Sequence, residues 1–490
     1  MTWQPDPSVL DQVDAPIAGA EATTISGFRE LTRDSLTFGL GAVVGKIAGF
    51  VMVLILVRLM SPGALGDLDV VMALLNTLAV VALLQVEVAA TRLYFDQDTV
   101  DDRRRLIGTF GALIAVSTLA VAGILALLAV PVASALFGAD TLAPAVTAAA
   151  LGVVGMGFEA FALTVLRVTA RPRAFATVEG VSFVLYLVAA PVLLALWQPD
   201  ATAVMAGWAI SVGVAAIVGL FLVRPELGMR PSMRAARALL GLAAPLAPVA
   251  VAVVAAEFVN RAILLDRGGS EEVAFFTVGL RFASVAAIAV TAFQLALQPR
   301  AYRLGASDPA LRQTGRDGYR VIVAILGLAV AGAAIAPEAI PFLAGATYAS
   351  AVAPFGWGLL AATAGALFLV GSISSSLARA TRDIAVAAAI GAGAGILANL
   401  ALASVAGAVG TAVAITLGQF LAAIIVIRAG ARHASPLVPW RVVGLLTALA
   451  AVVVLGFTQP TGGLATGLRL AIAILVELVL VREFARGRSA

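Results

Sequence analysis

Cysteine is absent from the 490-residue sequence, and histidine occurs once, at His433. Without cysteine the chain has no disulfide, no thiol nucleophile and no thiolate ligand for a metal. A single histidine leaves little for a histidine-based metal or acid–base site. Charged residues make up 12%, about half the usual share of a soluble domain. These absences argue against a soluble enzyme, a disulfide-rich secreted protein and a disordered chain.

Apolar residues fill the sequence instead, at 61%, and they stand in long uninterrupted runs. No charge occurs in 106–130, in 181–199 or in 384–427. About 20 apolar residues in a helix span the hydrocarbon core of a bilayer, and these runs do not alternate as barrel strands do. The sequence therefore predicts an all-α polytopic membrane protein, because helices satisfy their own backbone hydrogen bonds in lipid.

Fourteen membrane helices are expected. Their predicted spans are 35–59, 68–91, 106–130, 143–166, 174–197, 202–223, 238–264, 273–298, 318–340, 354–378, 384–403, 406–427, 438–458 and 464–484. Pro245 and Pro248 should kink or loosen the seventh span, since each removes a backbone donor.

Arginine shows which ends of these spans share a side of the membrane. Most of the 32 Lys and Arg residues fall in the head, the tail and every second loop. Because cytoplasmic loops carry the excess of Lys and Arg, we expect both termini in the cytoplasm. The net charge of +4 then reflects topology and contact with anionic lipid, and nucleic acid is not an expected partner.

An internal repeat is indicated by two similar segments, 61–66 and 269–274, which are 208 residues apart. An even number of spans separates them, so the repeated units should be parallel. The expected units are a disordered cytoplasmic tail (1–33), a first lobe of six helices (34–224), a second lobe of six (236–428), an appended helix pair (438–484) and a short tail (485–490).

Several motifs resemble bacterial polysaccharide flippases of the multidrug/oligosaccharidyl-lipid/polysaccharide exporter superfamily. They are LVRLMSP (56–62) with Leu65-Gly66 inside the stretch 34–95, the stretch 260–274 leading to QPRAYR (298–303), Pro337-Glu338, Gly345, Tyr348, and the turn between Asn399 and Ala412. The sequence departs from the family at Ala274 and Phe276, where Gly and Tyr are usual.

The resemblance implies a two-lobed cavity and export of an undecaprenyl-diphosphate-linked oligosaccharide for surface polysaccharide. The protein would then perform no covalent chemistry and need no cofactor. Its partners would be the lipid-linked oligosaccharide, membrane lipids and, in the same process, a polysaccharide polymerase and glycosyltransferases.

Charged residues inside predicted helices are the candidate site, because each must face a cavity or a partner. Lys46, the single lysine, lies deep in the first span and could hold a diphosphate; the alternative is an ion pair between helices. Arg281 and Glu257 have similar predicted depths and could meet. Arg261 follows Glu257 by one helical turn, so the two could also neutralise each other.

Carboxylates supply the second set of candidates. Glu159 and Glu179 could carry a proton, although structural pairing with Arg167 or Arg173 is the simpler expectation. Glu87, five residues before Arg92, is expected to pair or reach the interface.

Other functions stay open at this point. A multidrug or small-molecule cation antiporter of the same superfamily would favour a net acidic site. A membrane glycan polymerase, ligase or glycosyltransferase would need catalytic groups on large external loops, and the predicted external loops are short. A scaffold without transport activity is the fourth alternative.

Overall fold

The computed structural model is all-helical and describes residues 49–197, 200–227, 230–245, 247–305, 307–433, 438–458 and 466–486. A helix at Gly49–Leu59 comes first. The elements that follow are α3 (Pro62–Leu83), α4 (Val86–Phe95), α5 (Val100–Leu127), α6 (Ala129–Phe137), α7 (Ala143–Val168), α8 (Pro172–Leu196), α9 (Ala201–Val223), η1 (Arg224–Glu226), α10 (Met233–Ala243), α11 (Ala247–Gly268), α12 (Ser270–Leu304), α13 (Asp308–Ala344), η2 (Ala346–Ala351), α14 (Val352–Leu377), α15 (Thr381–Gly430), α16 (Trp440–Thr458) and α17 (Thr466–Arg486).

Local sequence explains most of these boundaries. The Ser61 hydroxyl accepts a hydrogen bond from the Ala64 amide, and Pro62 occupies the first helical position, where it loses no hydrogen bond. Thr99 caps α5 in the same way through the Asp102 amide. α6 ends at Gly138, whose φ of 70° is a left-handed conformation that glycine adopts easily.

Ten of the described helices are long and apolar enough to cross a membrane. Ten is fewer than the fourteen membrane helices expected from the sequence, and three features account for the difference. α11 and α17, which each carry several charges, are not among the ten, and α15 counts once although it bends at Ala406 and Gly407. Most of the first expected span lies outside the described residues. Apolar side chains such as Leu127, which is 84% exposed, cover the outside, as a lipid-facing surface requires.

Three expected spans are each divided in two. The span at 238–264 is broken between α10 and α11, as Pro245 and Pro248 predicted. The span at 106–130 is α5 plus α6, with the break at Leu128. The span at 68–91 is α3 plus α4, separated by Leu84 and Gln85, both of which have positive φ. Pro131, three residues after Leu128, marks the break between α5 and α6, whereas no glycine or proline marks the break at Leu84 and Gln85.

The 208-residue offset of the two sequence segments recurs in the helix starts. Pro62 begins α3 and Ser270 begins α12, while Val100 begins α5 and Asp308 begins α13. Both pairs are 208 residues apart. Agreement at two independent boundaries means that the repeat is carried by the helices themselves and not only by a short motif.

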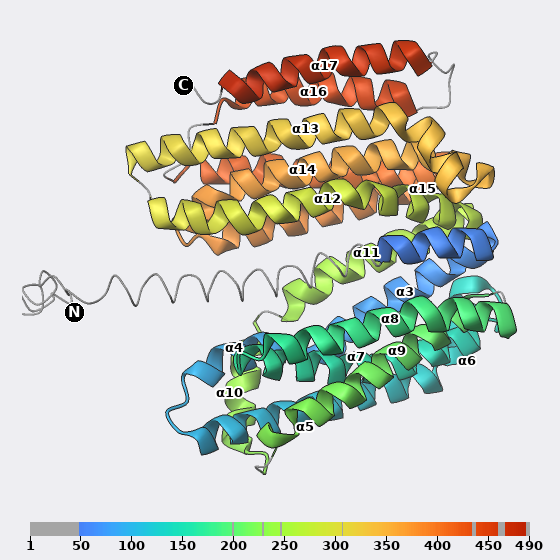
Figure 1. Cartoon of the computed structure of the whole chain (residues 1–490), viewed down its shortest axis with the longest axis vertical. Helices are drawn as coiled ribbons and strands as arrows, with labels where there is room; N and C mark the ends of the chain where they lie inside the picture. Colours follow the sequence, from blue (N-terminus) through green and yellow to red (C-terminus); the bar gives the residue numbers. More distant parts are fainter. Residues whose placement is uncertain are drawn as a thin grey trace, which may run out of the picture.

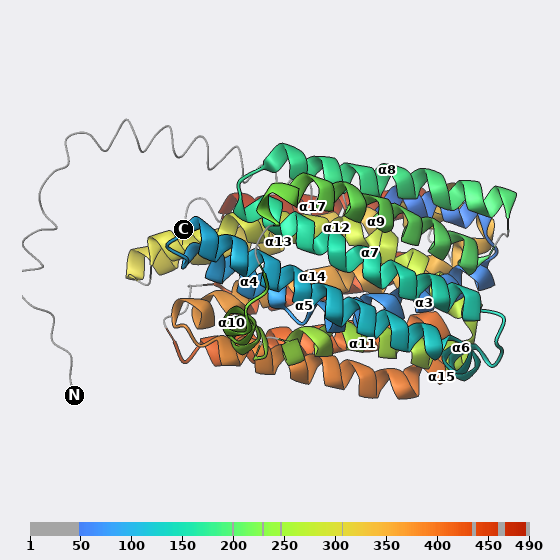
Figure 2. The same ribbon diagram turned by 90° about the horizontal axis from the view of Figure 1, so that it is seen from below.

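Two groups of helices lie side by side (Figure 1). The N-terminal group contains α3 to α9, and the C-terminal group contains α11 to α17, with α11 nearest the boundary. They touch where α3 packs against α11 and α12. This contact lies toward the end at which α3 and α12 start, called here the Pro62 end. At the opposite, arginine-rich end, α10 runs across the direction of the other helices (Figure 2).

Candidate functional site

The backbones of the two groups come very close together at Gly66 of α3. A Cβ atom on Gly66 would lie 1.8 Å from the carbonyl oxygen of Ser270 and 3.2 Å from the amide nitrogen of Ala274. Glycine is therefore required at this crossing. The Ser270 hydroxyl also donates a hydrogen bond to the carboxylate of Asp67. Gly66 and Ala274 are themselves 208 residues apart, so equivalent positions of the repeat meet here.

Asp69, one turn further along α3, is buried at the same contact. Its Oδ2 accepts hydrogen bonds from Arg261 Nε and from the Thr277 hydroxyl, each at 2.6 Å. Arg281 Nη2 lies 4.0 Å from its other oxygen, Oδ1. Asp69 and Thr277 are again 208 residues apart. One carboxylate of the N-terminal group thus faces two arginines of the C-terminal group.

The two arginines differ in how firmly they are held. Arg261 has a side chain only 14% exposed, pairs with Asp69, donates to the backbone carbonyl of Glu257 at 3.1 Å and lies over the Phe276 ring. Arg281 is 48% exposed and reaches Asp69 only at the ion-pair limit. Its charge also acts on Tyr186 of α8, in the other group. Arg281 is therefore the cation with donors left for a ligand.

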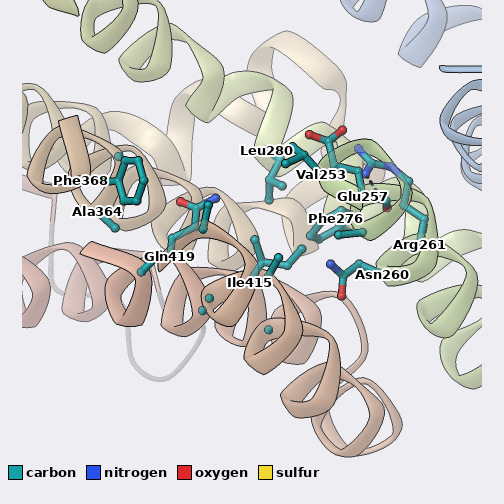
Figure 3. A pocket seen from close by; sticks show the side chains of 18 residues that line it. Val253, Glu257, Asn260, Arg261, Phe276, Leu280, Ala364, Phe368, Ile415 and Gln419 are labelled. Atoms are coloured by element: carbon teal, nitrogen blue, oxygen red, sulfur yellow. Dashed lines mark hydrogen bonds between the residues drawn. The ribbon is translucent and has the colours of Figure 1, made fainter. Parts of the chain in front are cut away.

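A cavity of about 460 Å³ opens beside Arg261, among α11, α12, α14 and α15. Figure 3 shows Glu257, Asn260 and Gln419 among its polar lining, with Phe276 and Phe368 among the apolar part. Asn260 is fixed by Asn399, whose amide nitrogen donates to its side-chain oxygen at 3.0 Å. The volume falls within the usual range of small-molecule sites.

Glu257 does not form the expected ion pair with Arg261. The carboxylate that binds Arg261 is Asp69, and Glu257 is exposed in the cavity lining, although its charge acts on Arg261 at longer range. Arg261 is thus neutralised by Asp69 of the other helix group, and not by Glu257 one turn away on its own helix. Arg281 and Glu257 form no ion pair among the described residues either.

Glu159, Glu179 and Glu87 lie together in the N-terminal group, on α7, α8 and α4. Glu159 is 9% exposed and hydrogen-bonds with Ser182, and the charge of Glu179 acts on it. The charge of Arg167 acts on both Glu179 and Glu87, but the expected ion pairs of Glu159 and Glu179 with Arg167 or Arg173 do not form within the described residues. The expected partner of Glu87, Arg92, pairs with Asp96 instead, at 3.9 Å.

Lys46 lies outside the described residues. Within the described part of the chain, no group of three or more His, Asp or Glu residues has the spacing for a metal ion.

Sequence reasoning missed Asp69. Its span was predicted to begin at residue 68, which left Asp69 at the edge of a loop, where a charge needs no partner. Two signals could have found it. Ser61-Pro62 is a helix-start signature that places Asp69 one to two turns inside α3, and the 208-residue offset maps it onto Thr277.

Many apolar helices in two repeated groups, with ionic contacts buried where the groups meet, define a multi-pass membrane protein. Residues 55–353 match the family model described as polysaccharide biosynthesis protein. This match covers well over half of the sequence, and the chain belongs to that family. The resemblance seen in the sequence motifs is confirmed.

Solved structures show the same fold at low identity. A lipid II flippase MurJ in an inward closed conformation has a TM-score of 0.67 and 14% identity, covering 93% of this chain and 100% of that one. An inward-facing multidrug resistance MATE family transporter of the MOP superfamily gives 0.62 and 13%, with 78% and 92% covered. A mutant of the Vibrio cholerae MATE transporter VcmN gives 0.55 and 18%, with 84% and 98% covered. Comparison with curated protein sequences found no match.

Proposed function

We propose that this protein moves an undecaprenyl-diphosphate-linked oligosaccharide across the bacterial cytoplasmic membrane by alternating access. The family supports a role in polysaccharide biosynthesis. The observation that carries the cargo assignment is Arg281, a half-exposed guanidinium beside a buried ion pair at the contact between the two helix groups. A diphosphate is a dianionic group that guanidinium binds well.

Under this proposal each charged residue has a role. Arg281 binds the diphosphate, because its contact with Asp69 is long and easily exchanged. Arg261 keeps Asp69 occupied and holds α11 to α3. Lys46, outside the described residues, is proposed from the sequence as a second cation for the diphosphate. The charge of Arg167 on α7 attracts Glu87 of α4 and Glu179 of α8, and Glu159 is the candidate for coupling to protons.

The topology proposed for this function has fourteen crossings. α11, α17, both halves of α15 and the helix ending at Leu59 join the other apolar spans. The lobes are 34–224 and 236–428, with 438–484 appended, and the shared 208-residue offset of helix starts supports their equivalence. With the arginine-rich end and both termini in the cytoplasm, the Pro62 end faces outward. The close contact at Gly66 then closes the transporter to the outside.

One observation favours a second function, the export of organic cations. Glu257 is a carboxylate exposed in a cavity that Phe276 and Phe368 also line. A carboxylate with aromatic walls suits a cationic substrate better than an anionic one. Under this alternative Glu257 binds the substrate, whereas under the flippase proposal it does not contact the cargo.

Measuring polysaccharide export by variants of the protein distinguishes the two functions. In a strain that lacks the chromosomal gene, we expect lipid-linked oligosaccharide to remain on the cytoplasmic side and surface polysaccharide to fall. Arg281→Gln should fail to restore export at normal protein abundance, while Arg281→Lys should restore part of it. Glu257→Gln is the matched control, because it removes the neighbouring cavity charge, and it should restore export.

The opposite pattern would overturn the flippase proposal. Full export by Arg281→Gln would show that Arg281 does not bind the cargo. Loss of resistance to cationic drugs with Glu257→Gln, together with unchanged polysaccharide, establishes the antiporter instead. Abundance is measured in the membrane fraction for every variant, so that a folding defect is not taken for a transport defect.

A further inference from the structure

A second cavity, also of about 460 Å³, lies at the Pro62 end and shares no lining residue with the first. Its walls come from α12, α13, η2, α14, the bend of α15, α16 and α17. The lining is mainly apolar and includes Phe275, Pro341 and Phe457, with Glu272 and Arg469 as its charged residues. A cavity of this size is too large for an ion alone and too small for a whole phospholipid.

Arg469 is buried in this wall with a donor left over. It is 5% exposed, and its Nη2 donates to the carboxylate of Glu338 and, at 3.5 Å, to the Thr466 hydroxyl. Its Nε is buried and has no hydrogen-bond partner. An unmet donor on a buried charged group is costly, so an acceptor inside the cavity would stabilise this arrangement.

The nearby carboxylates do not supply that acceptor. Glu338 binds Nη2, and its side chain is 53% exposed. Glu272 Oε2 accepts from the Ala408 amide at 2.6 Å, where the second half of α15 begins. The other Glu272 oxygen accepts no hydrogen bond within the described residues, and Glu272 lines the cavity. The cavity therefore offers a cationic donor and a carboxylate acceptor to the same occupant.

The position suits a lipid headgroup. Arg469 is three residues from the start of α17, about 5 Å inside the helix end, which is the depth of the headgroup region if α17 crosses the membrane. Its neighbours Leu468 and Leu470, 51% and 40% exposed, present apolar surface to the lipid. Phe342, beside Pro341 of the cavity wall, is 78% exposed. A ligand with an acyl chain could leave the cavity along this surface.

We propose that this cavity binds the phosphate headgroup of a phospholipid of the outer leaflet, with the phosphate on Arg469 and a headgroup hydroxyl or ammonium on Glu272. The site lies apart from Arg281 and goes beyond the proposed export function. Its occupant holds α16 and α17 to α12, α13 and α14 at their outer ends.

Native mass spectrometry of the full-length protein tests this directly. The purified protein is delipidated and titrated with phosphatidylethanolamine, phosphatidylglycerol or phosphatidylcholine. We expect tight retention of the first two, which carry a headgroup donor, and weaker retention of the third. Arg469→Gln should weaken retention of the first two about tenfold, the effect of losing one charge-assisted hydrogen bond. Arg469→Lys should lose less.

Two controls separate binding from packing. Glu338→Gln removes the carboxylate partner of Arg469 but not the cation, so retention should stay the same or rise. Arg267→Gln, a half-exposed arginine at the same end, should change nothing. If Glu338→Gln loses lipid as Arg469→Gln does, the arginine serves only the ion pair and the proposal is wrong. Inorganic phosphate is the ligand control. If it raises the thermal unfolding temperature as much as a phospholipid does, the cavity is not a lipid site. Neither readout depends on export, so the flippase proposal can fail independently.

Discussion

Asp69 shows how a single side chain can join two halves of a transporter. It is the only described carboxylate that receives hydrogen bonds from Arg261 and Thr277, and both lie in the opposite helix group. A charge buried between helices is stable only when its partner stays in place. Whatever separates α3 from α12 must therefore give Asp69 and Arg261 other partners, such as water or the cargo.

This residue supports a prediction on stability. Asp69→Asn strands Arg261 in a buried position, and removing one partner of such a pair costs roughly 3–5 kcal/mol. We expect a clear fall in the thermal unfolding temperature of the purified protein. The double variant Asp69→Asn/Arg261→Gln leaves no unpaired charge and should recover most of the loss.

The exposed pair of Asp266 and Arg267 is the control, because its side chains are 74% and 50% exposed. Asp266→Asn should change stability by less than about 1 kcal/mol. An unchanged unfolding temperature in Asp69→Asn would show that Arg261 finds another partner, and that the ion pair does not hold the two groups together.

At this scale the sequence identified the cations but not the pairing. Arg261 and Arg281 were candidates because a charge within an apolar helix needs a cavity or partner. Their shared partner is about 200 residues away in the chain, so no local spacing could reveal it. Glu257 was paired with Arg261 on helical periodicity alone, and a tertiary ion pair replaced that local one.

Among single elements, the bend of α15 is the one that the sequence predicts most clearly. Two spans at 384–403 and 406–427 were expected, and the helix bends at Ala406 and Gly407. Gly407 has a φ of 50°, and a Cβ there would lie 2.3 Å from Glu272 Oε2. The same carboxylate oxygen accepts from the Ala408 amide, so Glu272 caps the second half of α15.

Gly407→Ala should therefore disrupt the bend. The positive φ alone costs about 1–3 kcal/mol for a residue with a side chain, and the new methyl group displaces Glu272 from its cap. We expect lower thermal stability and lower membrane abundance. Gly393→Ala, in the same helix with open space around it, should be neutral or stabilising by up to about 1 kcal/mol. Equal behaviour of the two variants would contradict the role of Gly407.

One element boundary lay beyond the sequence, and another was marked in it but not predicted. α3 ends at Leu84 and Gln85, which have positive φ without glycine, and no glycine or proline marks this break. α5 passes into α6 at Leu128, three residues before Pro131, which removes a backbone donor as Pro245 and Pro248 do near the break between α10 and α11. The break at Leu128 was therefore open to prediction from the sequence, whereas the break at Leu84 was not.

For the whole molecule, the repeat is what the sequence predicted best. An offset of 208 residues links the starts of α3 and α12, and equivalent residues such as Asp69 and Thr277 touch each other. The sequence showed the period, but which equivalent positions touch each other follows only from the three-dimensional packing.

Closure at the Pro62 end leads to the last prediction, and the absence of cysteine makes it simple to test. Asp67 and Ser270 hydrogen-bond across the two groups. The paired substitutions Asp67→Cys and Ser270→Cys should therefore cross-link under mild oxidation in membranes. If the groups must part at this end in every cycle, the cross-link should stop export, and a reductant should restore it. Each single cysteine variant should export normally with or without oxidant.

A second cysteine pair shows whether a cross-link as such impairs the protein. Asp383 and His433, whose side chains lie 3.1 Å apart, belong to the same helix group at the arginine-rich end. Cysteines at these two positions should also cross-link, but export should continue because the bond lies within one moving unit. Full export by the cross-linked Asp67–Ser270 variant would mean that the Pro62 end does not open. Alternating access between these two groups of helices would then be wrong, although the family and the fold would stand.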